Sequence, residues 1–160
     1  RRGYRGNNSV IVADKRRKGW QMVPVSTPRQ IASGVLVYRF SHSLYYANAA
    51  QFAEEVLFLV KARAQPPLAC LCVEAAAIGD VDFSAAAMLR DTGQALREQG
   101  IRMVFAHLSM DVRAQFERHG ITESLGEHAI YGSIHAVVAE YEAQPGKGEA
   151  AAANGSAAPA

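Results

Sequence analysis

The sequence has little cysteine and no long hydrophobic run. Its 160 residues include two cysteines, Cys70 and Cys72, at positions i and i+2 of one apolar run. On a strand these thiols point to the same face, too far apart to bridge easily. Two isolated buried thiols are typical of a reducing cytosol. No apolar stretch approaches the roughly 18 residues that cross a bilayer, and no signal-peptide core follows the basic N-terminus. We therefore expect no membrane-spanning segment in these residues.

Motifs of common enzymes and metal sites are also missing. The sequence contains neither the G-x-S-x-G elbow of serine hydrolases nor the G-x-x-x-x-G-K-[ST] phosphate loop. The histidines lack a regular metal-ligand spacing; they are His42, His107, His119, His128 and His135. The sequence thus predicts a protein that is not an enzyme, with no catalytic residue and no metal site.

Charge is distributed unevenly along the chain, although the net charge is +2. Residues 1–30 carry eight basic side chains and one acid, whereas the other 130 residues carry nine basic and fourteen acidic ones. The densest basic group is Lys15, Arg16, Arg17 and Lys18. Such a segment suits an anionic membrane surface or nucleic acid, and a solvated basic loop fits the charge pattern equally well. Because no nucleic-acid-binding motif is present, we expect no nucleic-acid partner.

Apolar periodicity predicts strands that alternate with helices. Short strands are expected at 10–12 and 20–25, the second at a sheet edge because of Pro24, and further strands at 35–40, 68–73 and 101–106. Helices are expected at 48–64 and 84–99, after Ser109, and around 134–141. This order indicates an α/β fold: a mixed sheet of about four to five strands with helices packed on it. Residues 1–30 form a basic arm with the first strands, residues 31–144 the domain core, and residues 145–160 a disordered tail rich in Ala, Gly and Pro.

The helix expected at 48–64, with Asn48 as its cap, has one apolar stripe and one polar face. Gln51, Glu54, Glu55 and Lys61 form the polar face, and Phe58 lies in its middle. An exposed aromatic residue is more often a tolerated surface residue; the alternative is an anchor for a partner.

Two segments carry a resemblance to a known family. In the first, Gly34 opens an apolar run with Arg39 near its end, and Leu44-Tyr45-Tyr46-Ala47-Asn48-Ala49 follows. The second is Ile78-Gly79-Asp80-Val81-Asp82-Phe83-Ser84-Ala85, a loop before a helix. Together, in this order and spacing, they resemble the STAS domain of SulP-type anion transporters, which implies a STAS-like α/β sheet.

The resemblance also implies a function, a partner and a location. It implies a cytosolic regulatory or interaction domain of an anion transporter, often a sulfate transporter, at the cytoplasmic face of the plasma (inner) membrane. The partner is then the transmembrane domain of the same polypeptide. Basic residues next to a membrane span stay on the cytoplasmic side and attract anionic lipid headgroups, which gives Lys15, Arg16, Arg17 and Lys18 a membrane-proximal role.

The family includes bacterial anti-sigma-factor antagonists, in which a serine of the second segment is phosphorylated. That position is Phe83 here, which has no hydroxyl, and the following Ser84 is expected to cap the helix. This difference favours the transporter domain and leaves an antagonist-like interaction switch as the alternative.

The loop residues Gly79, Asp80, Val81, Asp82, Phe83, Ser84 and Ala85 are the candidate regulatory site. A helix N-terminus binds anions, and some STAS domains are proposed to bind nucleotides, so the resemblance suggests GTP, GDP or ATP with Mg²⁺ here. The two aspartates would repel phosphates without a metal. The competing interpretations are that one carboxylate satisfies the free amides of the helix N-terminus, or that the loop docks against the transporter or another protein.

Overall fold

The computed structural model describes residues 7–62 and 66–144. Residues 1–6 of the predicted basic arm and the predicted tail at 145–160 lie outside the described residues. None of the described helices is both long enough and apolar enough to cross a bilayer.

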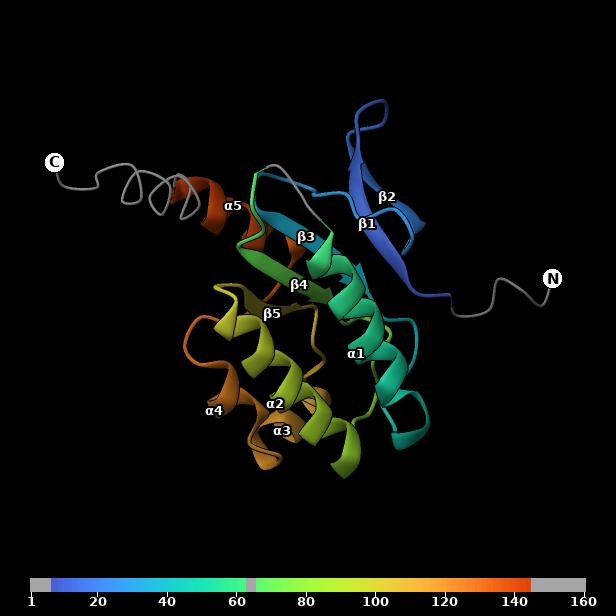
Figure 1. The fold of residues 1–160 in the computed structure, drawn as a ribbon, viewed down its shortest axis with the longest axis vertical. Helices are drawn as coiled ribbons and strands as arrows, with labels where there is room; N and C mark the ends of the chain where they lie inside the picture. The colour runs from blue at the N-terminus through green and yellow to red at the C-terminus, as the bar shows by residue number, and fades with distance from the viewer. Residues whose placement is uncertain (1–6, 63–65, 145–160) are drawn as a thin grey trace, which may run out of the picture.

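A single mixed sheet of six strands forms the centre of the domain (Figure 1). The strand order is β2-β1-β3-β4-β5-β6; β1 is antiparallel to β2 and β3, and the remaining neighbours are parallel. The strands are β1 (Ser9–Asp14), β2 (Gly19–Pro24), β3 (Val35–Arg39), β4 (Cys70–Glu74), β5 (Arg102–Ala106) and β6 (Ile130–Tyr131). The expected α/β fold is confirmed. The sheet has six strands, whereas the sequence predicted about four to five. The two-residue β6 is too short to show a period.

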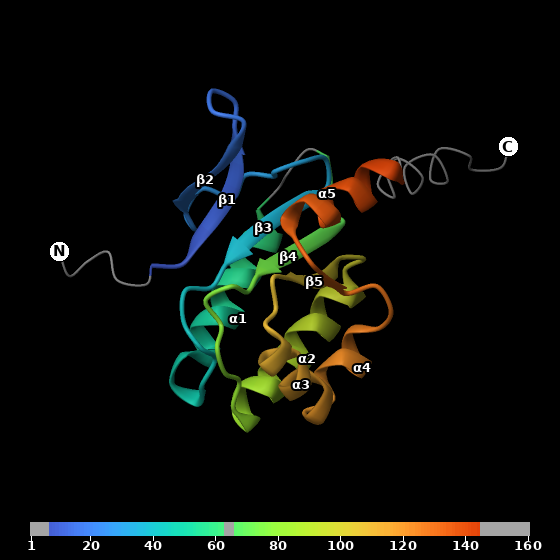
Figure 2. The same cartoon turned by 180° about the vertical axis from the view of Figure 1, so that it is seen from behind.

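Helices cover both faces of this sheet. They are α1 (Tyr46–Lys61), α2 (Phe83–Glu98), α3 (Met110–Arg118), α4 (Ile121–Leu125) and α5 (Ile134–Ala143). Figures 1 and 2 show α1 and α2 on one face, α5 on the other, and α3 and α4 beside α2. The sequence did not predict α4, because its five residues complete little more than one turn.

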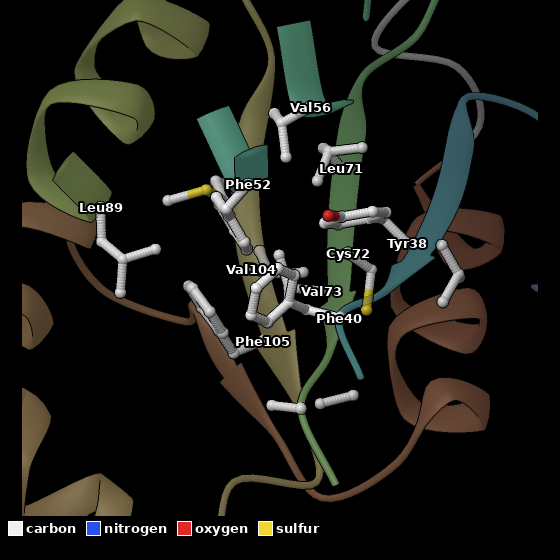
Figure 3. Packing of buried hydrophobic residues seen from close by; sticks show 14 of the residues in the cluster. Tyr38, Phe40, Phe52, Val56, Leu71, Cys72, Val73, Leu89, Val104 and Phe105 are labelled. Carbon is white, nitrogen blue, oxygen red and sulfur yellow. The ribbon is translucent and has the colours of Figure 1, made fainter. Parts of the chain in front are cut away.

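The apolar run at 68–73 becomes the central strand, as predicted. Every residue of β4 is buried, including Cys70 and Cys72, which are not joined in a disulfide. Aromatic rings pack over this strand on the α1 face: the Phe52 ring meets Tyr38 and Phe40 edge-on, with centroids 5.5 and 5.4 Å apart (Figure 3). Such edge-to-face pairs contribute beyond simple area burial.

The expected polar face of α1 needs one correction. Glu55 is partly buried, because its Oε1 accepts hydrogen bonds from the Tyr38 hydroxyl at 2.5 Å and from Asn8 Nδ2 at 2.7 Å. Burial, followed by this contact, raises the pKa of Tyr38 well above its usual range. Phe58 is half exposed, as the stripe predicts.

The cap of α1 also differs from the prediction. The helix begins at Tyr46, two residues before Asn48. Asn48 reaches back from the first turn, where its Oδ1 accepts from the Tyr45 amide at 2.9 Å and its Nδ2 donates to the Ser43 carbonyl at 2.8 Å. The predicted residue therefore does stabilise the helix start, from the third helical position.

Two phenylalanines of α1 provide a matched test of the core. We expect Phe52→Ala to lower the free energy of unfolding by about 3–5 kcal/mol, because a fully buried ring leaves a cavity. Phe58→Ala, on the exposed face, should change it by no more than about 0.5 kcal/mol. Urea unfolding of both variants measures the difference, and equal losses would contradict the packing.

Candidate functional site

The loop that precedes α2 lies at the carboxyl end of β4, where it is tied to the loop that follows β3. The Leu44 amide donates to the Asp80 carbonyl at 2.9 Å, and the Asp82 amide donates to the Leu44 carbonyl at 3.0 Å. The Gly79 amide donates to Ser43 Oγ at 3.1 Å. Two loops that are far apart in sequence therefore form one short ladder at this end of the sheet.

Asp82 joins the starts of two helices. Its Oδ1 accepts from the Ala85 amide of α2 at 2.8 Å, and its Oδ2 accepts from the Tyr46 amide of α1 at 2.9 Å. These hydrogen bonds, led by that from Ala85, lower the pKa of the Asp82 carboxyl below its usual value. The prediction that Ser84 caps α2 was wrong, since Asp82 takes that position. The interpretation in which one carboxylate satisfies the helix amides is confirmed.

The second aspartate of the loop has a local role. Asp80 Oδ1 accepts from the Val81 amide at 3.0 Å, and its Oδ2 accepts from the Tyr45 hydroxyl at 3.3 Å. The same Val81 amide meets the buried Gln115 Oε1 of α3 at 2.9 Å. These contacts join the loop to Tyr45, the residue before α1, and to Gln115 of α3.

The residues of the loop do not fit a bound phosphate. The helix amides that would receive it already bind the Asp82 carboxylate, and Asp80 adds a second negative charge. Residues 75–89 contain no basic side chain. Within residues 7–62 and 66–144, no group of three or more His, Cys, Asp or Glu side chains could hold a metal ion. The loop itself supplies neither a cation for the phosphate nor a complete ligand set for Mg²⁺; the nearby basic group is the imidazole of His119, whose ring centroid lies 6.5 Å from that of Phe83.

Large side chains project from the same end of the domain. Tyr46, Phe83 and Met110 are the first residues of α1, α2 and α3, and they are 78%, 77% and 87% exposed. All three helices start beyond the carboxyl ends of parallel strands, so their first residues gather at one end of the sheet (Figure 1). Exposed side chains of this size at three neighbouring helix starts make this end a candidate interaction surface. We call these three residues the apolar end.

A cluster of polar side chains around the buried Glu74, which the sequence analysis missed, lies next to this end. Glu74, the last residue of β4, is 6% exposed. Its Oε1 lies 2.8 Å from His107 Nδ1, and its Oε2 lies 3.7 Å from Arg39 Nε. Arg39 and Glu74 are partners in the β3–β4 register. The sequence does carry one sign of this cluster. A titratable residue ends β3 (Arg39), ends β4 (Glu74) and directly follows β5 (His107).

The predicted basic residues lie at the opposite end of the sheet. Lys15, Arg16, Arg17 and Lys18 form the turn between β1 and β2, and all four are exposed. Because β1 runs antiparallel to β3, its far end lies beside the beginning of β3, away from the apolar end. The structure therefore separates the two groups of predicted site residues, while Phe58 lies apart from both, near the end of α1.

A family model for the STAS domain matches residues 27–137, which is more than half of the chain. The chain belongs to the STAS domain family. The match includes all of β3, β4, β5 and the loop that carries Asp82 and Phe83. No curated protein sequence gave a significant match.

Solved structures share this STAS fold at low sequence identity. The murine Solute Carrier 26 family member A9 anion transporter is 18% identical, with a TM-score of 0.71; the match covers 86% of this chain and 22% of the transporter. The SulP transporter STAS domain from Vibrio cholerae is 19% identical (TM-score 0.56; 69% and 86% covered). The unphosphorylated anti-sigma-factor antagonist SpoIIAA is 12% identical (TM-score 0.56; 72% and 94% covered). This chain thus spans less than a quarter of the length of the transporter.

Removing Asp82 tests its role in this STAS domain. We expect Asp82→Ala to lower the free energy of unfolding by about 1–2 kcal/mol at neutral pH, because two helix starts lose an acceptor. Since the folded-state pKa is lowered, this stabilisation is complete above the unfolded pKa of about 3.9 and is lost as pH falls through the folded value. The difference between wild type and variant should therefore shrink in acid.

Asp80→Ala is the matched control, because it removes the same charge from the same loop but caps no helix. Denaturant unfolding at neutral and acidic pH measures both variants. An equal loss for Asp80→Ala, or a difference that does not depend on pH, would contradict the assignment.

Proposed function

We propose that this chain is the cytosolic regulatory and docking domain of a SulP-type anion transporter, at the cytoplasmic face of the membrane, and has no catalytic activity. The observation that carries the proposal is Phe83. It is 77% exposed at the start of α2, where the antagonist resemblance places a phosphorylated serine. A large exposed ring suits a lasting protein contact, whereas a phosphorylation switch needs a hydroxyl at that position.

Similarity in fold fits both functions. The anion transporter structure covers 86% of this chain with a TM-score of 0.71. The Vibrio cholerae SulP STAS domain and SpoIIAA both give a TM-score of 0.56, with 69% and 72% of this chain covered, so the choice between the functions depends on Phe83. Sulfate is the anion that the resemblance suggests, and the transmembrane part of the polypeptide would select it.

The apolar end is the proposed contact with the rest of the transporter polypeptide. Tyr46, Phe83 and Met110 supply exposed apolar area. Two exposed carboxylates are close to them in sequence: Asp80 lies in the loop before Phe83, and Asp111 follows Met110 in α3. A complementary partner surface is apolar with a basic margin. The basic turn faces the other way, so we propose that anionic lipid headgroups contact Lys15–Lys18 while protein contacts the apolar end.

Nucleotide binding at the loop stays a prediction, and the geometry disfavours it. Phosphates would have to displace the Asp82 carboxylate from two helix amides. A Mg²⁺ ion that offset both aspartates would need further ligands.

Position 83 tests the docking contact in the full transporter. We expect Phe83→Ser to reduce assembly or transport at least tenfold, since aromatic anchors at interfaces are worth about 2 kcal/mol or more. A photoreactive residue at position 83 should crosslink to the transmembrane part of the same assembly. Transport assays and crosslink mapping in membranes provide the measurements.

Phe58→Ser is the matched control and also tests the second predicted partner residue. If Phe58→Ser leaves transport unchanged, the predicted partner role of Phe58 is wrong. If Phe83→Ser also leaves transport unchanged, or position 83 crosslinks exclusively to unrelated proteins, the docking proposal fails.

An isotope-edited NMR titration with GTP, GDP and ATP, with and without Mg²⁺, tests nucleotide binding. We expect the signals of Gly79–Ala85 to stay unchanged at millimolar ligand, because the amides are already hydrogen-bonded to Asp82. Saturable shifts centred on this loop would contradict that expectation and would make the domain a nucleotide-responsive regulator.

A further inference from the structure

A hollow with basic walls lies beside the β1–β2 hairpin. Strand β1 pairs with β2 along its whole length, through Asp14, but it pairs with β3 over Ser9–Ile11 alone. Beyond Ile11 the hairpin continues away from the rest of the sheet, as Figures 1 and 2 show. Between it and residues 29–31 lies a hollow of about 510 Å³. Its lining includes Lys15, Arg16 and Arg29, so basic side chains from two separate segments meet at one place.

The hairpin side of this hollow has a fixed backbone. Asp14 Oδ1 accepts from the amides of Arg16 at 3.0 Å and Arg17 at 3.3 Å. Lys18 adopts a left-handed conformation, with φ of 53°, where the turn closes. Asp14 is the one acidic residue in the lining, and its Oδ1 is occupied by these backbone amides. The turn is thus shaped by a carboxylate, which leaves the basic side chains exposed.

The Arg29 side is fixed as well. The neighbouring Gln30 donates from Nε2 to the Pro66 carbonyl at 2.7 Å, and its Oε1 accepts from the Gly34 amide at 2.8 Å. These two bonds hold the segment that carries Arg29. Because both walls are held before any ligand arrives, binding there costs little ordering of the backbone.

The charge of the hollow determines what it can bind. Within residues 7–62 and 66–144, Lys15, Arg16 and Arg29 form no ion pair; both salt bridges found there involve Glu74. Three cations against the one Asp14 carboxylate leave the lining with an excess of positive charge, which favours an anion with several charges, and arginine matches phosphate oxygens in pairs. A volume of about 510 Å³ accommodates a sugar-sized ring with its substituents.

Exposed residues on β2 show what else the hairpin presents. Trp20 and Met22 project from one face of β2 and are 38% and 61% exposed. Gln21, which lies between them, lines the hollow, so Trp20 and Met22 are on the opposite face of the strand, where the Trp20 ring also packs against His135 at 4.6 Å between centroids. Tryptophan is enriched at the interface between membrane and water, so this hairpin suits a bilayer surface although these two side chains do not line the hollow.

We propose that this hollow binds a multiply phosphorylated, sugar-sized headgroup, with Lys15, Arg16 and Arg29 contacting its phosphate oxygens. The inference deepens the lipid contact of the proposed function by naming the ligand class and by adding Arg29, which lies outside the basic turn. General attraction to anionic lipid would not depend on Arg29 in particular. Binding in this hollow would, because Arg29 lines it.

The test compares two vesicle types with the full chain. Phosphatidylcholine vesicles contain either phosphatidylinositol bisphosphate or phosphatidylserine, matched for total charge, and sedimentation gives the affinity for each. Wild type should prefer the phosphoinositide vesicles. Arg29→Gln should lower this preference about tenfold, the loss expected for a charge-assisted hydrogen bond to phosphate.

Arg17→Gln is the matched control, since it removes the same charge from the turn but does not line the hollow. It should weaken binding to both vesicle types equally, and leave the preference unchanged. Thermal unfolding checks that both variants fold; exposed side chains at these positions predict unchanged transitions.

The outcomes separate this inference from the proposed lipid contact. If wild type binds both vesicle types equally, or both variants lose the same amount on both, the hollow is not a site, while the general lipid contact stands. If wild type binds neither vesicle type, both fail. Calorimetry with free inositol trisphosphate distinguishes the source: tighter, Arg29-dependent binding of the free compound would assign the hollow to a dissolved phosphate ligand in place of a lipid.

Discussion

The carboxylate of Asp82 links the first turns of α1 and α2 through one hydrogen bond to each helix. Without it, two helix starts at the same end of the sheet would present unsatisfied amides, and the Leu44–Val81 ladder would lose its support. The position of Phe83 depends on this contact, because the residue follows Asp82 directly and opens α2. The same interaction occupies two helix amides that a phosphate would need. One side chain therefore determines both which surface the loop presents and which ligands it disfavours.

Glu74 places a second constraint at the same end of the sheet. Its carboxylate is buried at the end of the central strand and meets Arg39 and His107 from the strands on either side. A buried charge without such partners would be strongly destabilising. The pairing thus holds the ends of β3, β4 and β5 in register, directly behind the helix starts that carry the apolar end. The packing of the sheet and the exposed surface are coupled through these few polar contacts.

The sequence predicted the elements whose signals are local and missed those that depend on distant partners. The apolar run around Cys70 and Cys72, the edge position implied by Pro24 and the Ser109 cap were all visible in short windows. One of the two loop carboxylates was expected to meet helix amides, without a choice between Asp80 and Asp82; the contact of Asp82 with Tyr46 joins residues 36 positions apart. Glu55 looked like a surface residue because its partners are distant in sequence: Tyr38 lies on β3 and Asn8 lies just before β1. Arg39, Glu74 and His107 became a cluster only through strand register, which periodicity does not specify.

The separation of the basic turn from the apolar end has a mechanical consequence. The strands between them are about 17 Å long, at roughly 3.3 Å for each of five residues, and their core is tightly packed, so the domain moves as one stiff body. A tilt imposed at one end must swing the other end through the same angle. In the proposed arrangement, a change in how the hairpin meets a charged surface would reach a partner at Phe83 as a rotation of the whole domain, over a distance set by the length of the sheet.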